Sequence, residues 1–172
     1  STAGLTFAYL GDGANNMAHS YLLGCALAGM HVRIATPASH QPRADIVARA
    51  QRHAAAQGGS ILITDDPVVA ASGADVVATD TWVSMGMEAE SEQRHGAASP
   101  FEPFRVSEAL MAKAAPDAVF LHCLPAYRGY EVDASVIDGP SSLVWDEAEN
   151  RLHAQKALLS WLMEQHRAGD GR

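Results

Sequence analysis

The sequence predicts an α/β fold in which a doubly wound, mainly parallel sheet of about five strands is flanked by helices. Short apolar runs alternate along the chain with segments of helical periodicity, and this alternation favours parallel pairing through right-handed crossovers. The length of 172 residues is that of one ordinary domain, and 48% hydrophobic with 19% charged residues is typical of a protein with an apolar core. We therefore expect a single domain over residues 1–172.

The first half of the chain shows this alternation most clearly. Residues 6–10 form an apolar run that predicts a buried strand, and Gly11 and Gly13 permit a sharp turn into a helix that starts near Asn15. Apolar residues recur along that helix in steps of three and four, so one of its faces is expected to be buried. The pattern then repeats as a strand, a helix and a strand at residues 31–36, 42–57 and 60–64.

The second half is less regular. Residues 65–67 cap a short helix that ends at Ser72, and a strand follows it. The stretch that ends at Pro103 and starts near Met87 has no helical or strand pattern, and loops of this length are usually functional or disordered. The other elements are strands at 74–79 and 118–121 and helices at 107–115 and 148–166. Apolar residues of the final helix spread over more than half of its circumference, so we expect a further surface to cover it.

Charge and composition exclude several classes of protein. Twelve Lys and Arg against twenty Asp and Glu give a formal net charge of -8, which argues against a nucleic-acid surface because phosphate backbones bind clustered cations. No apolar run approaches the length of a membrane span. The first residues lack the pattern of a signal peptide and suggest a cut into a longer chain. Cys25 and Cys123 show no disulfide or zinc spacing, and we expect a cytoplasmic location.

Neither a nucleotide cofactor nor a metal is predicted. The two glycines after the first strand resemble a dinucleotide-binding turn, but Asn16 stands in place of the third glycine. The second strand also ends at Thr36 rather than at an acidic residue. His122 and Cys123 are adjacent, and adjacent strand residues point to opposite faces, so we do not expect them to share a metal ion.

Polar side chains follow two of the strands at the point where each strand ends. Asp80 comes directly after the strand 74–79, with Ser84 four residues later, and Cys123 closely follows the strand 118–121. Ligands of open α/β sheets bind beyond the carboxyl ends of the strands, so these side chains are expected to form one site. A carboxylate and a hydroxyl at this edge suit the ammonium group of a ligand.

Other polar residues lie near the starts of two helices. Of the adjacent amides Asn15 and Asn16, one is expected to cap the first helix, which leaves the other to hydrogen-bond a ligand above the sheet edge. Arg151 lies near the start of the last helix, where a guanidinium suits either an anionic or carbonyl oxygen of a ligand or an exposed salt bridge.

Four segments together closely resemble the ornithine carbamoyltransferase family. In chain order they are Asp12-Gly13-Ala14-Asn15-Asn16-Met17, Asp80-Thr81-Trp82-Val83-Ser84-Met85-Gly86, His122-Cys123-Leu124-Pro125 and Glu147-Ala148-Glu149-Asn150-Arg151. The resemblance extends from about Thr6 to His166, and its second and third segments separate the chain from the aspartate branch of the superfamily. No segment matches the Ser-Thr-Arg-Thr-Arg loop or the His-Pro-x-Gln segment with which this family binds carbamoyl phosphate.

The resemblance therefore implies the C-terminal, ornithine-binding domain alone, with a Rossmann-like fold over residues 1–172. The carbamoyl-phosphate-binding domain is absent from this chain. By matching positions, the implied ligands of the α-amino and carboxylate groups of L-ornithine are Asn16, Asp80 and Ser84. Met85 would contribute from its backbone.

The resemblance also implies a reaction. Cys123 and Leu124 would lie beside the reacting δ-amine and the carbamoyl group, and Arg151 would contact carbamoyl phosphate. Because an alkylammonium must lose a proton before it attacks a carbonyl, we expect Cys123, coupled to Asp80, to assist that deprotonation and to orient the amine. The implied products are L-citrulline and phosphate, no cofactor takes part, and the intact enzyme is expected to be a homotrimer.

Two other functions remain open at this point. A carbamoyltransferase for putrescine or an acylated ornithine would differ in details of pocket shape, although Asp80 with Ser84-Met85-Gly86 favours free ornithine. A stand-alone amino-acid-binding module would need no phosphate-binding half. We expect the 172-residue chain to fold but not to form citrulline, because it lacks the cation cluster that a transferable phosphate group requires.

Overall fold

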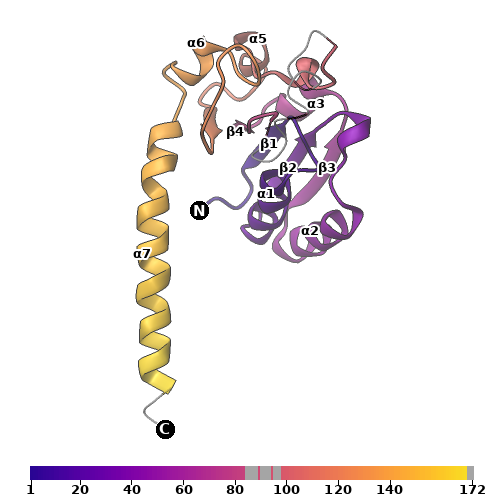
Figure 1. Cartoon of the computed structure of the whole chain (residues 1–172). Coiled ribbons are helices and arrows are strands. Elements are labelled where there is room, and N and C mark those ends of the chain that lie inside the picture. Colours follow the sequence, from indigo (N-terminus) through magenta and orange to yellow (C-terminus); the bar gives the residue numbers. More distant parts are fainter. Residues whose placement is uncertain (84–88, 90–93, 95–97, 170–172) are drawn as a thin grey trace.

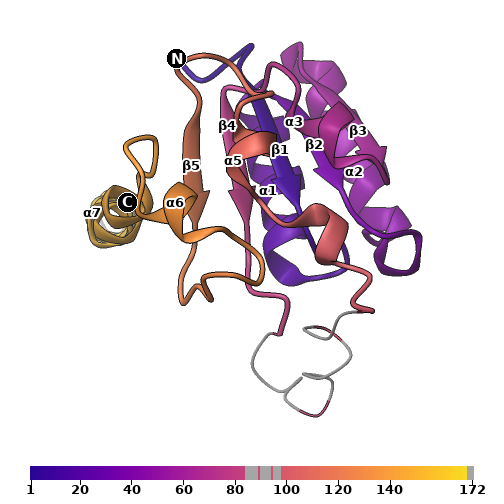
Figure 2. The ribbon, with the colours of Figure 1, turned by 90° about the horizontal axis from the view of Figure 1, so that it is seen from above.

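The computed structural model of the chain describes residues 1–83, 89, 94 and 98–169. Its five strands are parallel and form one sheet in the order β3-β2-β1-β4-β5 (Figure 2). The strands are β1 (Thr6–Leu10), β2 (His31–Ala35), β3 (Ser60–Thr64), β4 (Val76–Thr79) and β5 (Val119–His122). The chain runs outward from β1 to β3 and then crosses to β4 on the other side of β1. This is the predicted doubly wound topology, which is thereby confirmed.

Helices pack against both faces of the sheet. One face is covered by α1 (Asn16–Leu27) and α2 (Ala44–Gln57), and the other by α3 (Pro67–Ala71), α5 (Glu108–Met111) and α6 (Ala134–Ile137). The central strand β1 is buried along its whole length, and its successive side chains serve the two layers in turn. Phe7 and Tyr9 belong to the core under α1 and α2, whereas Ala8 and Leu10 belong to the core under α3, α5 and α6.

The structure differs from the sequence expectations in the short elements. The helix predicted at residues 107–115 is only the single turn α5, because Lys113 and Ala114 donate their N–H groups to carbonyls three residues back and tighten the chain. The turn α6 and the 3-10 turns η1 (Ala38–His40) and η3 (Glu102–Phe104) were not predicted. Elements of three or four residues are too short to show a period in the sequence.

The last helix, α7 (Val144–Gly169), starts four residues earlier than predicted and extends away from the rest of the molecule (Figure 1). Every side chain from residue 148 to residue 167 is exposed. The exposed large apolar side chains on this helix are those of Trp145, Leu152, Leu158, Leu159, Trp161, Leu162 and Met163. None of the residues that the structure describes supplies the covering surface that the sequence leads us to expect. Within the same part of the chain, no helix has the length and apolar character needed to cross a membrane.

Candidate functional site

The carboxyl ends of β1, β4 and β5 lie side by side and bring the predicted polar residues together. Asp80 follows β4 directly, and Cys123 follows β5. The thiol of Cys123 donates a hydrogen bond to Oδ1 of Asp80, with the sulfur and oxygen 3.1 Å apart. The expectation that the two strand ends form one cluster is confirmed. Asp80 follows β4, which pairs with β1 where the strand order reverses, and this is the usual place for a ligand in this topology.

Three donors fix the carboxylate of Asp80, whose side chain is buried. The backbone N–H of Thr81 donates to Oδ1 over 2.7 Å, and the amide of Asn15 donates to Oδ2 over 3.2 Å. The Cys123 thiol is the third donor. A buried carboxylate with this set of donors keeps one orientation. Its negative charge lies at the edge of the sheet, where it would attract an ammonium group.

The two adjacent asparagines have different positions. Asn15 caps α1 by accepting the N–H of Ala18 over 2.8 Å, and its amide also donates to the hydroxyl of Tyr9 over 2.9 Å. Asn15 is therefore both the helix cap and a member of the polar cluster, a double role that the sequence analysis missed. Asn16, the predicted ornithine ligand, is exposed at the first position of α1.

The thiol of Cys123 is protonated at neutral pH in this structure. Burial and the negative charge of Asp80, in that order, raise the pKa of Cys123 to about 12. The second cysteine, Cys25, lies in α1, and burial alone raises its pKa to about 11. Cys123 is thus a hydrogen-bond donor to Asp80 and not a thiolate.

Glu147, in the first turn of α7, contacts the cluster from the side. Its Oε2 accepts the backbone N–H of His122 over 2.9 Å, and its Oε1 accepts the hydroxyl of Tyr21 over 3.4 Å. Burial raises the pKa of this carboxyl. Glu147 has no predicted site role, although it lies in one of the four segments that resemble the family. The structure shows that it joins α1, β5 and α7.

The other predicted site residues differ in their exposure, and two of them are not described. Leu124 is half-buried and has a φ of +55°, a left-handed conformation that costs a residue with a Cβ atom roughly 1–2 kcal/mol. Arg151 is exposed on α7, one helical turn beyond Glu147. Ser84 and Met85, the remaining predicted ornithine ligands, lie outside the described residues.

A buried ion pair lies behind the cluster. Nη1 of Arg94 donates to Oδ2 of Asp12 over 2.7 Å and to the backbone carbonyl of Trp82 over 2.9 Å. The two side chains of this pair are only 10% and 5% exposed. The guanidinium also lies 5.3 Å from the ring centroid of Phe101. Arg94 therefore ties the segment after β4 to the turn after β1, a contact that no sequence motif indicated.

The glycine turn after β1 is shaped by packing. Gly11 has a φ of +133°, which residues with a side chain rarely adopt. A Cβ on Gly13 would lie 2.8 Å from the backbone oxygen of His40 and from a side-chain carbon of Thr36. Gly11 is thus required by its backbone conformation, and Gly13 by the close approach of neighbouring chain segments.

The geometry corrects the reason for not expecting His122 and Cys123 to share a metal ion. One donor atom from each of Asp80, His122 and Cys123 lies within 4.8 Å of the other two. The alternation of strand side chains does not apply, because β5 ends at His122. However, Nδ1 of His122 already accepts the N–H of Leu124, and the thiol already donates to Asp80. The absence of a resident metal stays a prediction.

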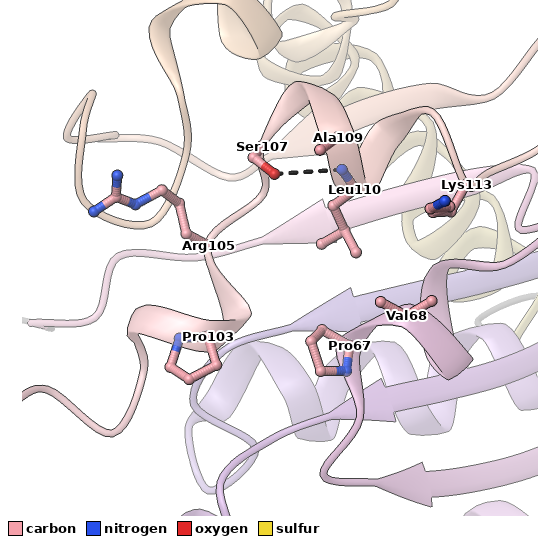
Figure 3. A pocket seen from close by; sticks show the side chains of 8 residues that line it. All are labelled: Pro67, Val68, Pro103, Arg105, Ser107, Ala109, Leu110 and Lys113. Atoms are coloured by element: carbon pink, nitrogen blue, oxygen red, sulfur yellow. Dashed lines mark hydrogen bonds between the residues drawn. The ribbon is translucent and has the colours of Figure 1, made fainter.

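A separate groove of about 250 Å³ lies between α3 and α5 (Figure 3). Pro67, Val68 and Leu110 line its apolar part. Arg105 and Lys113 are its cations, but Arg105 is paired with carboxylates of its own surface. None of the predicted site residues lines this groove, so we do not assign the chemistry to it.

Comparison with known proteins agrees with this geometry. The family described as "Aspartate/ornithine carbamoyltransferase, Asp/Orn binding domain" matches residues 3–162. The chain is 65% identical over 161 residues to an ornithine carbamoyltransferase of Renibacterium salmoninarum, an alignment that covers 94% of this chain and 51% of that relative. The chain thus spans about half the length of the curated relatives that it matches.

Solved structures show the same fold. Ornithine carbamoyltransferase from Pyrococcus furiosus superimposes with a TM-score of 0.86 at 48% identity, over 93% of this chain and 50% of that one. An N-acetyl-L-ornithine transcarbamylase matches with a TM-score of 0.78 at 30% identity, over 93% of this chain and 50% of that one. With the family matched over nearly its whole length, the chain belongs to the aspartate/ornithine carbamoyltransferase family, in which it corresponds to the Asp/Orn-binding domain of the ornithine carbamoyltransferases.

Proposed function

We propose that this chain forms the ornithine-binding half of an enzyme that transfers the carbamoyl group of carbamoyl phosphate to the δ-amine of L-ornithine. L-citrulline and phosphate are the products. The contact between the Cys123 thiol and the Asp80 carboxylate supports this proposal most directly, because it places a coupled acid and base at a ligand-binding edge. The same proposal has three further parts. They are a second half of the enzyme that holds carbamoyl phosphate, a homotrimeric assembly and a cytoplasmic location.

Ornithine binds as a dication with one carboxylate. The fixed charge of Asp80 attracts an ammonium group of the substrate, and Asn15 keeps the second carboxylate oxygen in place. The exposed Asn16 and the predicted ligands Ser84 and Met85 complete the contacts to the α-amino and carboxylate groups.

The reaction requires a neutral δ-amine. The δ-ammonium loses one proton, its nitrogen lone pair forms a bond to the carbonyl carbon, and the bond from that carbon to the phosphate oxygen breaks. The nitrogen gives its second proton to the departing phosphate, which leaves as the second product. Because burial and Asp80 keep the sulfur protonated, Cys123 assists as a thiol coupled to Asp80, and the carboxylate attracts the departing proton. Leu124 and Arg151 contact the carbamoyl phosphate.

The experiment that tests this function uses a chimera. In the chimera this chain replaces the matching half of the ornithine carbamoyltransferase of Renibacterium salmoninarum, to which it is 65% identical. Purified chimera is given carbamoyl phosphate with ornithine, N-acetylornithine or putrescine, and the carbamoylated product and phosphate are measured. We expect citrulline from ornithine, with kcat/KM for the other two amines lower by at least about 100-fold.

A chimera that folds but prefers N-acetylornithine or putrescine would overturn the ornithine assignment. Calorimetric titration of the unfused chain with ornithine tests the alternative of a stand-alone binding module. Such a module would bind ornithine with the same Kd in the unfused chain as in the chimera. We expect the unfused chain to form no citrulline. Measurable turnover by the unfused chain would contradict that expectation.

The role of Cys123 has its own test. Cys123→Ser keeps a hydroxyl that donates to Asp80 but removes the polarisable thiol, so it should lower kcat of the chimera while leaving its stability almost unchanged. Cys25→Ser, on α1 and away from Asp80, is the matched control and should leave kcat at its original value. Equal kcat in the two variants would remove Cys123 from the mechanism.

A further inference from the structure

His122 and Glu131 are completely buried polar residues that the proposed reaction does not use. A carboxylate and an imidazole in an apolar core are costly unless each has polar partners. Both accept backbone N–H groups of the turn 123–127, which carries Cys123 and Leu124. Their contacts therefore bear on how that turn is held.

The imidazole of His122 is joined to the backbone of the turn. Its Nδ1 accepts the N–H of Leu124 over 2.9 Å. A ring nitrogen that accepts a hydrogen bond carries no proton, so the imidazole is neutral and its proton is on Nε2. This one bond acts on Leu124, whose left-handed backbone an apolar side chain does not favour.

The carboxylate of Glu131 joins the two ends of the same turn. The protonated Nε2 of the neutral His122 ring lies 3.3 Å from Oε1 of Glu131, a close polar contact whose alignment is outside that of a hydrogen bond. The same Oε1 accepts the backbone N–H of Tyr127. Glu131 is held in turn through its own carbonyl, which accepts the N–H of Val106 over 2.9 Å. The segment 123–127 is thus fastened at its start through His122 and at its end directly.

We propose that Glu131 and His122 are a positioning pair that holds the turn 123–127 in the conformation required for carbamoyl transfer. The pair touches no substrate. It acts by fixing the Leu124 N–H and, with it, the direction of the Leu124 carbonyl and of the Cys123 thiol. This inference rests on the proposed function, since it assigns to that turn the contacts with the reacting amine and the carbamoyl group.

The alternative is that the pair only fills space in the core. The two explanations differ in what a substitution changes. A packing role predicts loss of stability alone. A positioning role predicts a lower kcat with little change in the KM for ornithine, because misplacement of the reacting groups acts on the chemical step.

The first test measures kcat and KM in the chimera for two variants of His122. His122→Asn places an amide oxygen near the position of Nδ1 and retains the acceptor for the Leu124 N–H, whereas His122→Leu has none. We expect His122→Leu to lower kcat by about 100-fold with KM within about twofold, and His122→Asn to recover most of that loss. Equal kcat in the two variants, or a loss confined to KM, would overturn the proposal.

Glu131 provides the second pair of variants. Glu131→Gln has the same shape and keeps an oxygen for the Tyr127 N–H, whereas Glu131→Ala removes both links. The alanine variant should lose kcat to a similar extent as His122→Leu, and the glutamine variant much less. If Glu131→Ala folds and keeps its original kcat, the assignment of Glu131 is wrong.

A measurement on the 172-residue chain separates this inference from the proposed function. Iodoacetamide alkylates Cys123 and Cys25, and the ratio of the two rates reports the turn, with Cys25 as the reference for overall folding. Loss of the bond to Leu124 in His122→Leu should raise the ratio about fivefold, the factor expected from one net hydrogen bond. In His122→Asn it should stay unchanged. An unchanged ratio in His122→Leu would refute positioning, and an inactive chimera with an altered ratio would refute only the carbamoyl-transfer function.

Discussion

The polar edge of the sheet and the helix α7 are opposite in kind. At the edge, polar groups are buried and nearly all have partners within the chain: Asp80 has three donors, Asp12 has Arg94, and Glu147 has His122 and Tyr21. Along α7, large apolar side chains are exposed and have no cover in the part of the chain that the structure describes. The polar edge is held by contacts within the chain, whereas the helix α7 has the composition of an element that packs against another surface.

The largest expected effect comes from breaking the buried ion pair behind the edge. Asp12→Asn leaves the guanidinium of Arg94 without its carboxylate in a buried position, which should lower the free energy of unfolding by about 3–5 kcal/mol. Urea denaturation of the 172-residue chain measures this. Asp138→Asn, which breaks the exposed pair with Arg128, is the control and should leave the urea midpoint nearly unchanged. Equal shifts in the two variants would show that the Asp12 pair is not buried in solution.

A second prediction compares the two regions directly by removing one leucine from each. Leu22→Ala deletes a side chain that is completely buried between α1 and the sheet, and it should cost about 2–5 kcal/mol. Leu159→Ala deletes a side chain that is 62% exposed on α7, and in the unfused chain it should change stability by less than about 0.5 kcal/mol.

The same two variants in the chimera sharpen this comparison. If the other half of the enzyme covers α7, the cost of Leu159→Ala should rise there toward about 2 kcal/mol, while that of Leu22→Ala stays the same. An unchanged small cost in the chimera would mean that α7 is exposed in the assembled enzyme as well.

The third prediction concerns the charge at the edge. Asp80→Asn keeps the shape of the side chain but removes the charge that attracts the ammonium group, so citrulline formation by the chimera should fall by at least about 100-fold. Asp75 is the matched control, because it lies just before the start of the same strand, where its carboxylate accepts the N–H of Thr6. Asp75→Asn should lower the free energy of unfolding and leave kcat nearly unchanged. A fully active Asp80→Asn chimera would contradict the proposed binding mode.

The smallest effect is the pH dependence of Cys123 alkylation. Because its pKa is raised to about 12, the thiolate fraction and the alkylation rate should increase tenfold per pH unit between pH 7 and 10. Asp80→Asn removes a negative charge that raises this pKa, so the pKa should fall and the rate at pH 8 should increase, while the rate of Cys25 stays the same. A rate at Cys123 that already reaches its plateau by pH 8 would show that the thiol is not shielded as described.

The strands and the long helices could be predicted from the sequence because each has a period or a run that burial imposes. The apolar run of β1 reflects a strand buried on both faces, and the glycine after α2 marks its left-handed end. The single turns α5 and α6 carry no such period and depend on tertiary contacts. The start of α7 was missed because Val144 is buried against the sheet before the charged, exposed part of the helix begins.

The candidate site divides in the same way. The rule that ligands bind beyond the carboxyl ends of parallel strands correctly predicted that Asp80 and Cys123 lie close together, because it depends only on where two strands end. The contacts of Asn15, Glu147 and Arg94 depend on the exact distances between elements, and no local pattern contains that information. The mistaken argument about His122 and Cys123 shows the limit of strand alternation, which ceases to hold at the last residue of a strand.

The bond between Tyr21 and Glu147 joins residues that are 126 positions apart in the sequence. During synthesis on the ribosome, α1 and the first four strands are complete long before the first turn of α7 emerges. The polar edge therefore gains its last member only after all five strands have been translated. A chain that ends before Glu147 would keep all five strands but would lack the carboxylate that joins α1 to β5.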